Sequence, residues 1–139
     1  MGGGPLLRIP ADIHAGMIDH ARREAPHECV GMLAGSPAGL VQRRYELVNE
    51  LHSPERFRSE PRSLLAAEKQ RRADGLEFLA VYHSHLTSRP VPSRHDHAEH
   101  WGPQVACLIV SLERDPPEVA AWWLADGTAH PARLEVMAP

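Results

Sequence analysis

Two histidines and an aspartate are spaced in this chain as ligands of one metal ion. His83 and His85 lie one residue apart at the end of an apolar run, and Asp96 follows them after a short loop. Imidazole nitrogen and carboxylate oxygen are ligands of zinc, and a catalytic zinc site uses three protein ligands and keeps one open position. The full pattern, H-S-H, seven residues, S, two residues, D, is expected by chance in about one chain in a thousand of this composition. We therefore interpret it as a catalytic metal centre.

The sequence around these residues predicts how they are positioned. The apolar residues 76–82 form a strand-like run that leads directly into His83. Because side chains alternate along a strand, His83 and His85 point to the same side and can share one ion. The two prolines of residues 86–92 predict a stiff loop, and residues 93–101 predict a short helix.

Apolar periodicity and turn residues predict the other elements of the chain. We expect a strand at 6–9, a helix that ends before Pro26, strands at 29–34 and 40–47, a polar connection at 49–58, a helix from Pro61 to a stop at Gly75, and strands at 105–111, 119–125 and 132–136. This order indicates an α/β protein with a mixed sheet flanked by helices. We expect residues 1–5 to be a flexible lead and residues 6–139 to form one domain.

Composition and charge argue against several classes of partner. The formal net charge of −3 gives no strong attraction to nucleic acid or to an anionic membrane. No apolar segment approaches the ~20 residues of a membrane-spanning helix, and the N-terminus lacks the features of a signal peptide. Cys29 and Cys107 lie in apolar surroundings, as is typical of buried reduced thiols. We expect a cytoplasmic protein that binds neither nucleic acid nor membrane.

Other interpretations of the same residues are possible. Ser93 three residues before Asp96 is also the spacing of a capping box, which stabilises helix starts in many proteins. His95, His97 and His100 resemble the H-x-H-x-D-H signature of metallo-β-lactamase-like hydrolases, but Glu99 stands where that pattern has aspartate. We expect these three histidines to form a solvated helix face. A zinc deaminase would need P-C-x-x-C, which the two distant cysteines do not supply.

Taken with Glu28, these residues resemble the JAMM motif of the MPN (Mov34, PAD-1) metalloproteases. The family pattern is an early glutamate followed by H-[ST]-H-x7-S-x2-D, and the chain matches it with Glu28, the residues 83–85, Ser93 and Asp96. The resemblance extends over nearly the whole chain and implies a single MPN domain with a curved mixed sheet. One departure is Leu86, because the family usually has proline after the second histidine.

The resemblance also implies the role of each residue. His83, His85 and Asp96 would bind one catalytic Zn²⁺, with a water as the fourth ligand. Glu28 would act as the general base on that water, which suits the position of an acid at the entrance to a buried strand. Ser93 would donate a hydrogen bond to the oxyanion formed during hydrolysis.

The same resemblance implies a class of substrate. The compact 40–60 region lacks room for the insertions with which the family's eukaryotic deubiquitinases grip ubiquitin. The chain therefore resembles the small bacterial members, which cleave peptide or isopeptide bonds at the C-terminal tail of ubiquitin-like sulfur-carrier proteins. We expect that tail to lie in extended form along a sheet edge beside the metal. The alternative is an MPN scaffold that retains a metal without catalysis, and the sequence leaves the oligomeric state open.

Overall fold

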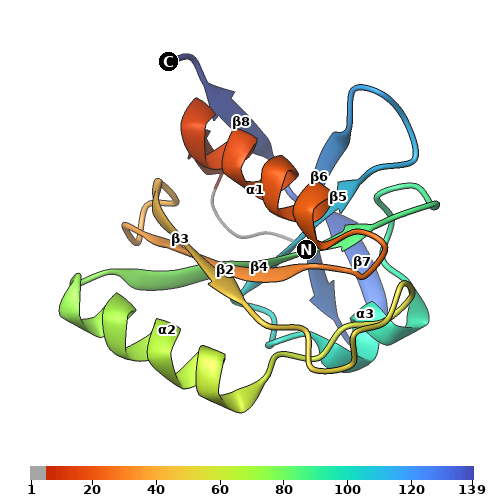
Figure 1. Ribbon diagram of the computed structural model, residues 1–139. Helices are drawn as coiled ribbons and strands as arrows, with labels where there is room; N and C mark the ends of the chain where they lie inside the picture. Colours follow the sequence, from red (N-terminus) through yellow and green to blue (C-terminus); the bar gives the residue numbers. More distant parts are fainter. Residues whose placement is uncertain (1–5) are drawn as a thin grey trace.

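The computed structural model describes residues 6–139 (Figure 1). Its elements are β1 (Leu7–Pro10), α1 (Ala11–Glu24), β2 (Val30–Gly35), β3 (Val41–Leu47), α2 (Pro61–Ala73), β4 (Glu77–His85), α3 (Arg94–Glu99), β5 (Ala106–Ser111), β6 (Glu118–Ala125), β7 (Thr128–Pro131) and β8 (Leu134–Met137). The order predicted from the sequence is confirmed as far as β6. The expected flexible lead at 1–5 lies outside the described residues.

Six of the strands form one mixed sheet. Its order is β3-β2-β4-β5-β6-β7, with β4 and β5 parallel and the other neighbours antiparallel. The parallel pair is joined through α3 and the loop before it, so the histidines at the end of β4 and the helix that follows them lie on one connection. The predicted fold class, an α/β protein with a mixed sheet flanked by helices, is confirmed. Strand β4 is internal, whereas β3 and β7 are the edges of the sheet.

The C-terminal part differs from the prediction of one strand at 132–136. A tight turn at Asp126 and Gly127, both with positive φ (52° and 74°), returns the chain at once as β7 along β6. Positive φ at both central residues is the turn that matches the twist of a hairpin. The chain then leaves the main sheet, and β8 pairs in parallel with β1 to form a separate two-stranded sheet.

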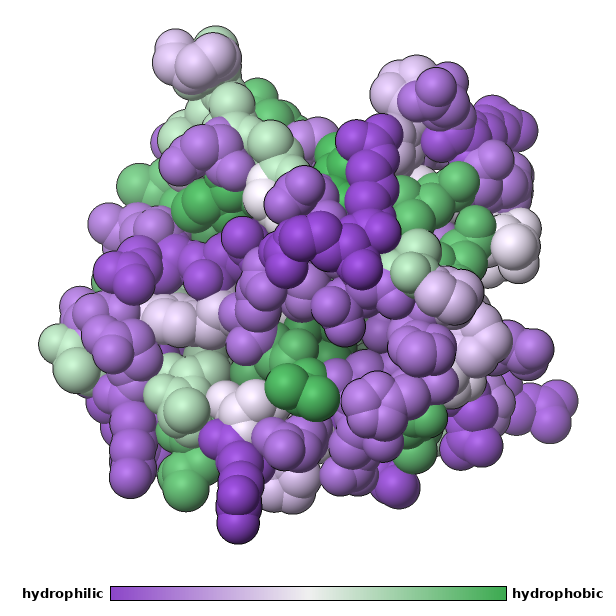
Figure 2. Space-filling view, viewed as in Figure 1, coloured by the Kyte–Doolittle hydropathy of each residue, from purple (hydrophilic) through white to green (hydrophobic). Residues whose placement is uncertain are grey.

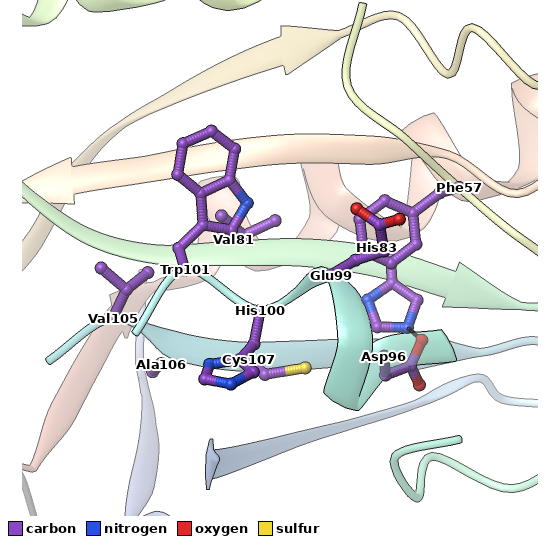
Figure 3. Close-up of a pocket in the computed structure, with 10 residues that line it drawn as sticks. All are labelled: Phe57, Val81, His83, Asp96, Glu99, His100, Trp101, Val105, Ala106 and Cys107. Atoms are coloured by element: carbon purple, nitrogen blue, oxygen red, sulfur yellow. Dashed lines mark ion pairs between the residues drawn. The ribbon is translucent and has the colours of Figure 1, made fainter. Parts of the chain in front are cut away.

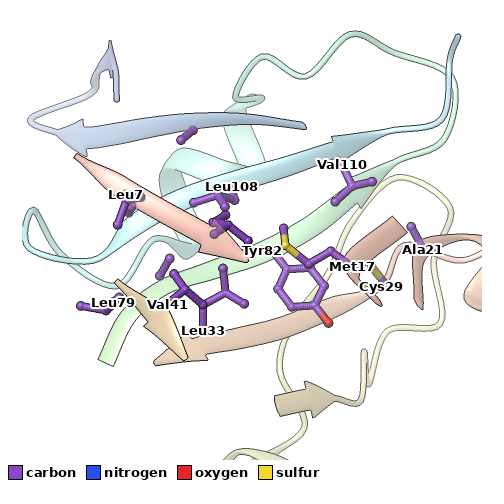
Figure 4. Packing of buried hydrophobic residues seen from close by; sticks show 14 of the residues in the cluster. Leu7, Met17, Ala21, Cys29, Leu33, Val41, Leu79, Tyr82, Leu108 and Val110 are labelled. Carbon is purple, nitrogen blue, oxygen red and sulfur yellow. The ribbon is translucent and has the colours of Figure 1, made fainter. Parts of the chain in front are cut away.

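The main sheet separates two layers of helices (Figure 1). On the face that we call the back, α1 and β1 pack against the sheet, and on the front lie α2 and α3. Figure 4 shows part of the back core, in which Met17 and Ala21 of α1 lie near Cys29 and Tyr82. The front core beneath α2 is formed by Val30, Met32, Ala34, Tyr45, Leu47, Phe57, Ala67 and Val81.

The surface and the cysteines agree with the composition. Figure 2 shows this side of the molecule as mostly hydrophilic, with separate hydrophobic groups. Across residues 6–139, no helix has the length and apolar character needed to cross a membrane. Cys29 and Cys107 are free and buried, as the sequence predicts. Of the consecutive tryptophans, Trp123 enters the back core and Trp122 lies on the front.

Candidate metal centre

The register of the sheet places both predicted histidine ligands on the front face. His83 pairs with Val30 of β2 on one side and with Ile109 of β5 on the other, and His85 pairs with Ser111 of β5. Strand alternation then directs both rings toward the front, where α3 brings Asp96 above them. The histidine side chains and Asp96 are at most 5% exposed. The three residues that the sequence singled out as ligands therefore meet at one buried point.

The distances among these ligand atoms fit a zinc ion. The two Nε2 atoms lie 3.3 Å apart, His83 Nε2 lies 2.9 Å from Asp96 Oδ1, and His85 Nε2 lies 3.1 Å from Asp96 Oδ2. Four ligands held tetrahedrally at zinc–nitrogen and zinc–oxygen distances of about 2.0–2.1 Å are separated from one another by about 3.3 Å. Two nitrogens and a carboxylate, with a different carboxylate oxygen near each nitrogen, suit a small divalent cation.

A capping box fixes Asp96 at the start of α3. The Ser93 backbone N–H donates to Asp96 Oδ2 at 2.8 Å, and the Asp96 backbone N–H donates to Ser93 Oγ at 3.2 Å. The capping interpretation of this pair is thus confirmed. It holds the carboxylate over the histidines, because the Asp96 side chain that faces them also accepts the Ser93 backbone N–H.

The other ring nitrogen of His85 determines which tautomer this residue adopts. His85 Nδ1 lies 2.9 Å from the carbonyl oxygen of Arg89. A carbonyl oxygen can only accept, so Nδ1 carries a proton, and Nε2 is the nitrogen that is directed at the centre. The ring of His83 stacks on that of Phe57, with centroids 4.5 Å apart and planes at 24°. Figure 3 shows Phe57 and Asp96 on either side of His83.

Charge at the centre is concentrated on Asp96. Burial alone would raise the pKa of Asp96, but the hydrogen bonds that its carboxylate accepts from His83, His85 and the Ser93 backbone lower that pKa well below its usual range. Burial alone would lower the pKa of His85, and its hydrogen bond to Asp96 outweighs this and raises it. The carboxylate is therefore held in its charged form, which is the form that binds metal.

Glu28 is placed beside this centre by the segment before β2. Its side chain is buried, and Oε1 has no hydrogen-bond partner among residues 6–139. Burial raises the pKa of Glu28 to about 8, while the charges of His85 and Asp96 also act on it. A buried carboxyl without a partner is costly unless a ligand or ion completes its environment. This residue therefore supports a site that takes a cation and a polar ligand.

Asn49 holds the backbone of Glu28 and is a site residue that the sequence does not predict. Its Nδ2 donates to the Glu28 and Arg56 carbonyl oxygens at 3.0 Å each, and its Oδ1 accepts from the Leu51 and Arg58 backbone N–H groups at 3.1 Å. All four hydrogen-bonding positions of the amide are used. An asparagine in a polar connection gives no sequence signal of this role, because its partners belong to two different segments.

Phe57 is also absent from the predicted site, although it is the one phenyl ring in the predicted polar connection. It is buried against His83 and lines two neighbouring hollows with Glu99, His100 and Trp101. The inner, water-sized hollow reaches His83 and Asp96 (Figure 3), and the outer one has a volume of about 290 Å³. The outer hollow lies between the segment before α2 and the end of α3, next to the inner hollow that His83 and Asp96 line.

The expectation of a solvated histidine face on α3 is wrong. His95, His97 and His100 are each partly buried, and within residues 6–139 the Nδ1 atom of His97 is buried without a partner. His100 Nδ1 accepts a hydrogen bond from the Gly102 backbone N–H at 3.1 Å. The helix is only six residues long and lies against the sheet, so it has too little free circumference to expose three rings.

Comparison with known proteins places the chain among JAB-domain proteins. A family model described as prokaryotic homologues of the JAB domain matches residues 10–125. The CysO-cysteine peptidase of Mycobacterium tuberculosis is 32% identical over 136 residues, covering 95% of this chain and 92% of the relative. The probable TtuB-protein conjugate cleaving protease of Thermus thermophilus is 37% identical over 94 residues, covering 67% and 62%.

Solved structures agree on the fold. A protein of Desulfitobacterium hafniense, solved in solution, is similar with a TM-score of 0.85 and 28% identity, covering 96% of this chain and 94% of that one. A JAB1/MPN domain protein from Archaeoglobus fulgidus has a TM-score of 0.63 at 18% identity, covering 96% and 100%. The second likeness, at this identity, concerns the fold alone.

Proposed function

Because the chain belongs to the prokaryotic JAB-domain family, we propose that it is a zinc-dependent peptidase or isopeptidase. The observation that carries the proposal is the convergence of two imidazole nitrogens and a carboxylate within about 3 Å of one another. Alongside them lies Glu28 Oε1, which has no hydrogen-bond partner among residues 6–139. The names of two similar proteins, a peptidase and a conjugate-cleaving protease, support the same reaction class.

His83, His85 and Asp96 would hold the zinc ion. A bound zinc ion supplies a Lewis acid that makes water more acidic and polarises a carbonyl group. The chain's own part is to present two imidazole nitrogens and one carboxylate, two of which are oriented by other groups before the metal binds. Asp96 is fixed by its cap and His85 by the Arg89 carbonyl.

Glu28 would move the proton. Its pKa of about 8 in the metal-free site means that it is protonated at neutral pH, and a cation beside it would favour the carboxylate. The carboxylate would then take a proton from the attacking water and return it to the departing amine, so one group serves as base and then as acid. Asn49 keeps the Glu28 backbone in place while the side chain does so.

Ser93 would stabilise the oxyanion. Its Oγ accepts the Asp96 N–H as a helix cap, which uses a lone pair and leaves the hydroxyl proton to donate. Capping and oxyanion donation are therefore compatible in one side chain, and capping restricts where the hydroxyl points. The Ser93 hydroxyl would then donate a hydrogen bond to the negative charge that develops on the substrate carbonyl oxygen.

The substrate we propose is the extended C-terminal tail of a ubiquitin-like sulfur-carrier protein or its conjugate. The names CysO-cysteine peptidase and TtuB-protein conjugate cleaving protease support a tail or conjugate as substrate. The strand that bears the histidines is internal, and the nearer sheet edge, β3, is separated from it by β2. The outer hollow beside Phe57 and Trp101 has room for part of such a tail, whereas the inner hollow at His83 and Asp96 holds only a water-sized group.

The test is cleavage of a panel of ubiquitin-like fusions by the purified zinc-loaded protein. We expect a cut after the terminal glycines, and we expect Glu28→Gln to keep its zinc and cleave about 10²–10⁴-fold more slowly. Glu24→Gln, an exposed change of the same kind at the end of α1, should cleave as the parent does. Full activity in Glu28→Gln would exclude this residue as the base. No cut of any fusion by zinc-loaded protein would favour the scaffold interpretation.

A further inference from the structure

The loop between the second histidine and Ser93 is bonded to three strands of the main sheet. Ser111 Oγ at the end of β5 donates to the Ser88 carbonyl at 2.6 Å, and the Trp122 Nε1–H of β6 donates to the Pro90 carbonyl at 2.9 Å. Between them, His85 Nδ1 of β4 donates to the Arg89 carbonyl at 2.9 Å. Three successive carbonyl groups thus each accept a hydrogen bond from a different strand.

The position of these donors follows from the sheet register. His85 pairs with Ser111, and Trp122 pairs with Cys107 on the same strand as Ser111, so all three donors project from the front face. Pro90 is buried although its neighbours Ser88 and Arg89 are exposed. The loop therefore bends down onto the sheet at Pro90, where the indole of Trp122 meets it.

We propose that Trp122 and Ser111 are positioning residues for the metal ligand His85, acting through the carbonyls of residues 88–90. We call the bonds to Ser88 and Pro90 the loop clasp. The Arg89 carbonyl lies between the two clasped carbonyls, so its position relative to the sheet is fixed from both sides. Its orientation in turn fixes the ring of His85 and keeps the proton on Nδ1, which leaves Nε2 free for the metal.

Leu86 leaves the start of this loop without the backbone restriction that proline would impose, so the loop depends more on its hydrogen bonds. Proline at that position would restrict the backbone at the start of the loop, whereas leucine leaves it free to rotate. The clasp replaces covalent stiffness with hydrogen bonds from β5 and β6. Groups that orient a metal ligand through its second nitrogen typically alter metal affinity by about 10–100-fold when they are removed.

Strand β6 offers a matched pair of variants for the test. Trp122→Phe removes the N–H donor to Pro90 and keeps an aromatic ring, and Trp123→Phe makes the same change one residue along, on the opposite face and in the back core. The first measurement is the zinc dissociation constant by competition with a chromophoric chelator. We expect about tenfold weaker zinc binding in Trp122→Phe. We expect Trp123→Phe to bind zinc as the parent does.

The second measurement needs no metal. In the metal-free protein, NMR should show the proton on His85 Nδ1 protected from solvent exchange, and this protection should be lost in Trp122→Phe and kept in Trp123→Phe. Ser111→Ala breaks the other bond of the clasp and should act in the same direction, which preserves the test should Trp122→Phe fail to fold.

Two results would overturn the proposal. One is that Trp122→Phe and Ser111→Ala both keep the parental zinc affinity and the parental protection of the His85 Nδ1 proton. The other is that Trp122→Phe and Trp123→Phe lose zinc affinity and proton protection to the same extent. The proposal rests on the proposed function only through the role of His85 as a ligand. If the parent bound no zinc, the proposed function would fail, whereas the proton measurement would still decide whether the clasp orients His85.

Discussion

A buried polar cluster that contains histidine lies on each face of strand β4, but the two clusters pair their polar atoms in different ways. On the back, His20 of α1 lies with its Nδ1 atom 2.7 Å from the hydroxyl of Tyr82, and that hydroxyl also accepts from Arg44 at 3.1 Å. On the front, His83 and His85 direct their Nε2 atoms at each other and at Asp96. Tyr82 and His83 are adjacent in sequence, so alternation alone separates the two clusters.

The back cluster continues to the surface as a series of hydrogen bonds and ion pairs. Arg44 donates to Glu46 at 2.8 Å, Arg23 also donates to Glu46, and His20 Nε2 lies 3.7 Å from the same carboxylate. Burial lowers the pKa of His20 and so favours the neutral ring, which accepts the Tyr82 proton at Nδ1. The Tyr82 hydroxyl, Arg44 and Arg23 thus each donate to an acceptor in this chain of contacts.

The front cluster has groups of the same chemical type pointing at one another and leaves Glu28 Oε1 unpartnered within residues 6–139. Both clusters are buried, so burial does not distinguish them. What distinguishes them is whether the polar atoms satisfy each other or converge on a point that a cation would fill. We interpret the back cluster as structural and the front cluster as a ligand site, and each of the following changes tests that distinction.

The largest effect is expected from His85→Ala on the front. Removing a first ligand should weaken zinc binding by more than about 100-fold, which exceeds the effect of groups that only orient ligands. The change should be measured by chelator competition and by metal content after gel filtration. Zinc binding equal to the parent would show that the site assignment is wrong.

Next in size is the effect of Gly31→Ala on the back. A Cβ at this position would overlap the ring of Tyr82, so we expect a loss of about 3 kcal/mol in the free energy of unfolding, at the upper end for overpacked cores. Zinc affinity of the folded protein should stay unchanged. In the double variant with Tyr82→Leu, the cost of Gly31→Ala should shrink, and purely additive losses would argue against this contact as the cause.

A smaller effect is expected from Tyr82→Phe. It removes the hydroxyl that joins His20 to Arg44, and the unsatisfied partners should cost about 1–2 kcal/mol in urea unfolding. Since the hydroxyl lies on the structural face, cleavage and zinc affinity should remain parental. A large fall in zinc affinity would mean that the two faces are coupled.

The smallest effect concerns pH. Burial by itself would raise the pKa of Glu46, but hydrogen bonds from Arg23 and Arg44 outweigh it and lower the pKa to about 2. On acidification the unfolded chain therefore binds this proton at a higher pH than the folded protein does. The contribution of Glu46 to the free energy of unfolding is complete above the unfolded pKa of 4.5 and is lost as the pH falls toward about 2. In urea unfolding between these two pH values, the free energy of unfolding should fall less steeply with falling pH in Glu46→Gln than in the parent. Equal slopes would contradict the prediction.

Much of the site could be predicted because its residues are fixed by local sequence. The alternation of His83 and His85 and the cap formed by Ser93 and Asp96 depend on neighbours a few positions away. The same holds for the helices, where Pro61 begins α2 and Gly75, with φ of 71°, follows its end. The two C-terminal strands could not be separated, because only pairing with β6 and β1 defines them.

By itself the sequence predicted three candidate ligands, the spacing that puts two of them on one face, and the capping box that holds the third. Only the tertiary structure decided what surrounds them. Asn49 holding Glu28, Phe57 stacked on His83 and Trp122 bonded to Pro90 join segments separated along the chain. The physical reason is that a hydrogen bond or ring contact depends on distance in space, and the register of the sheet sets that distance.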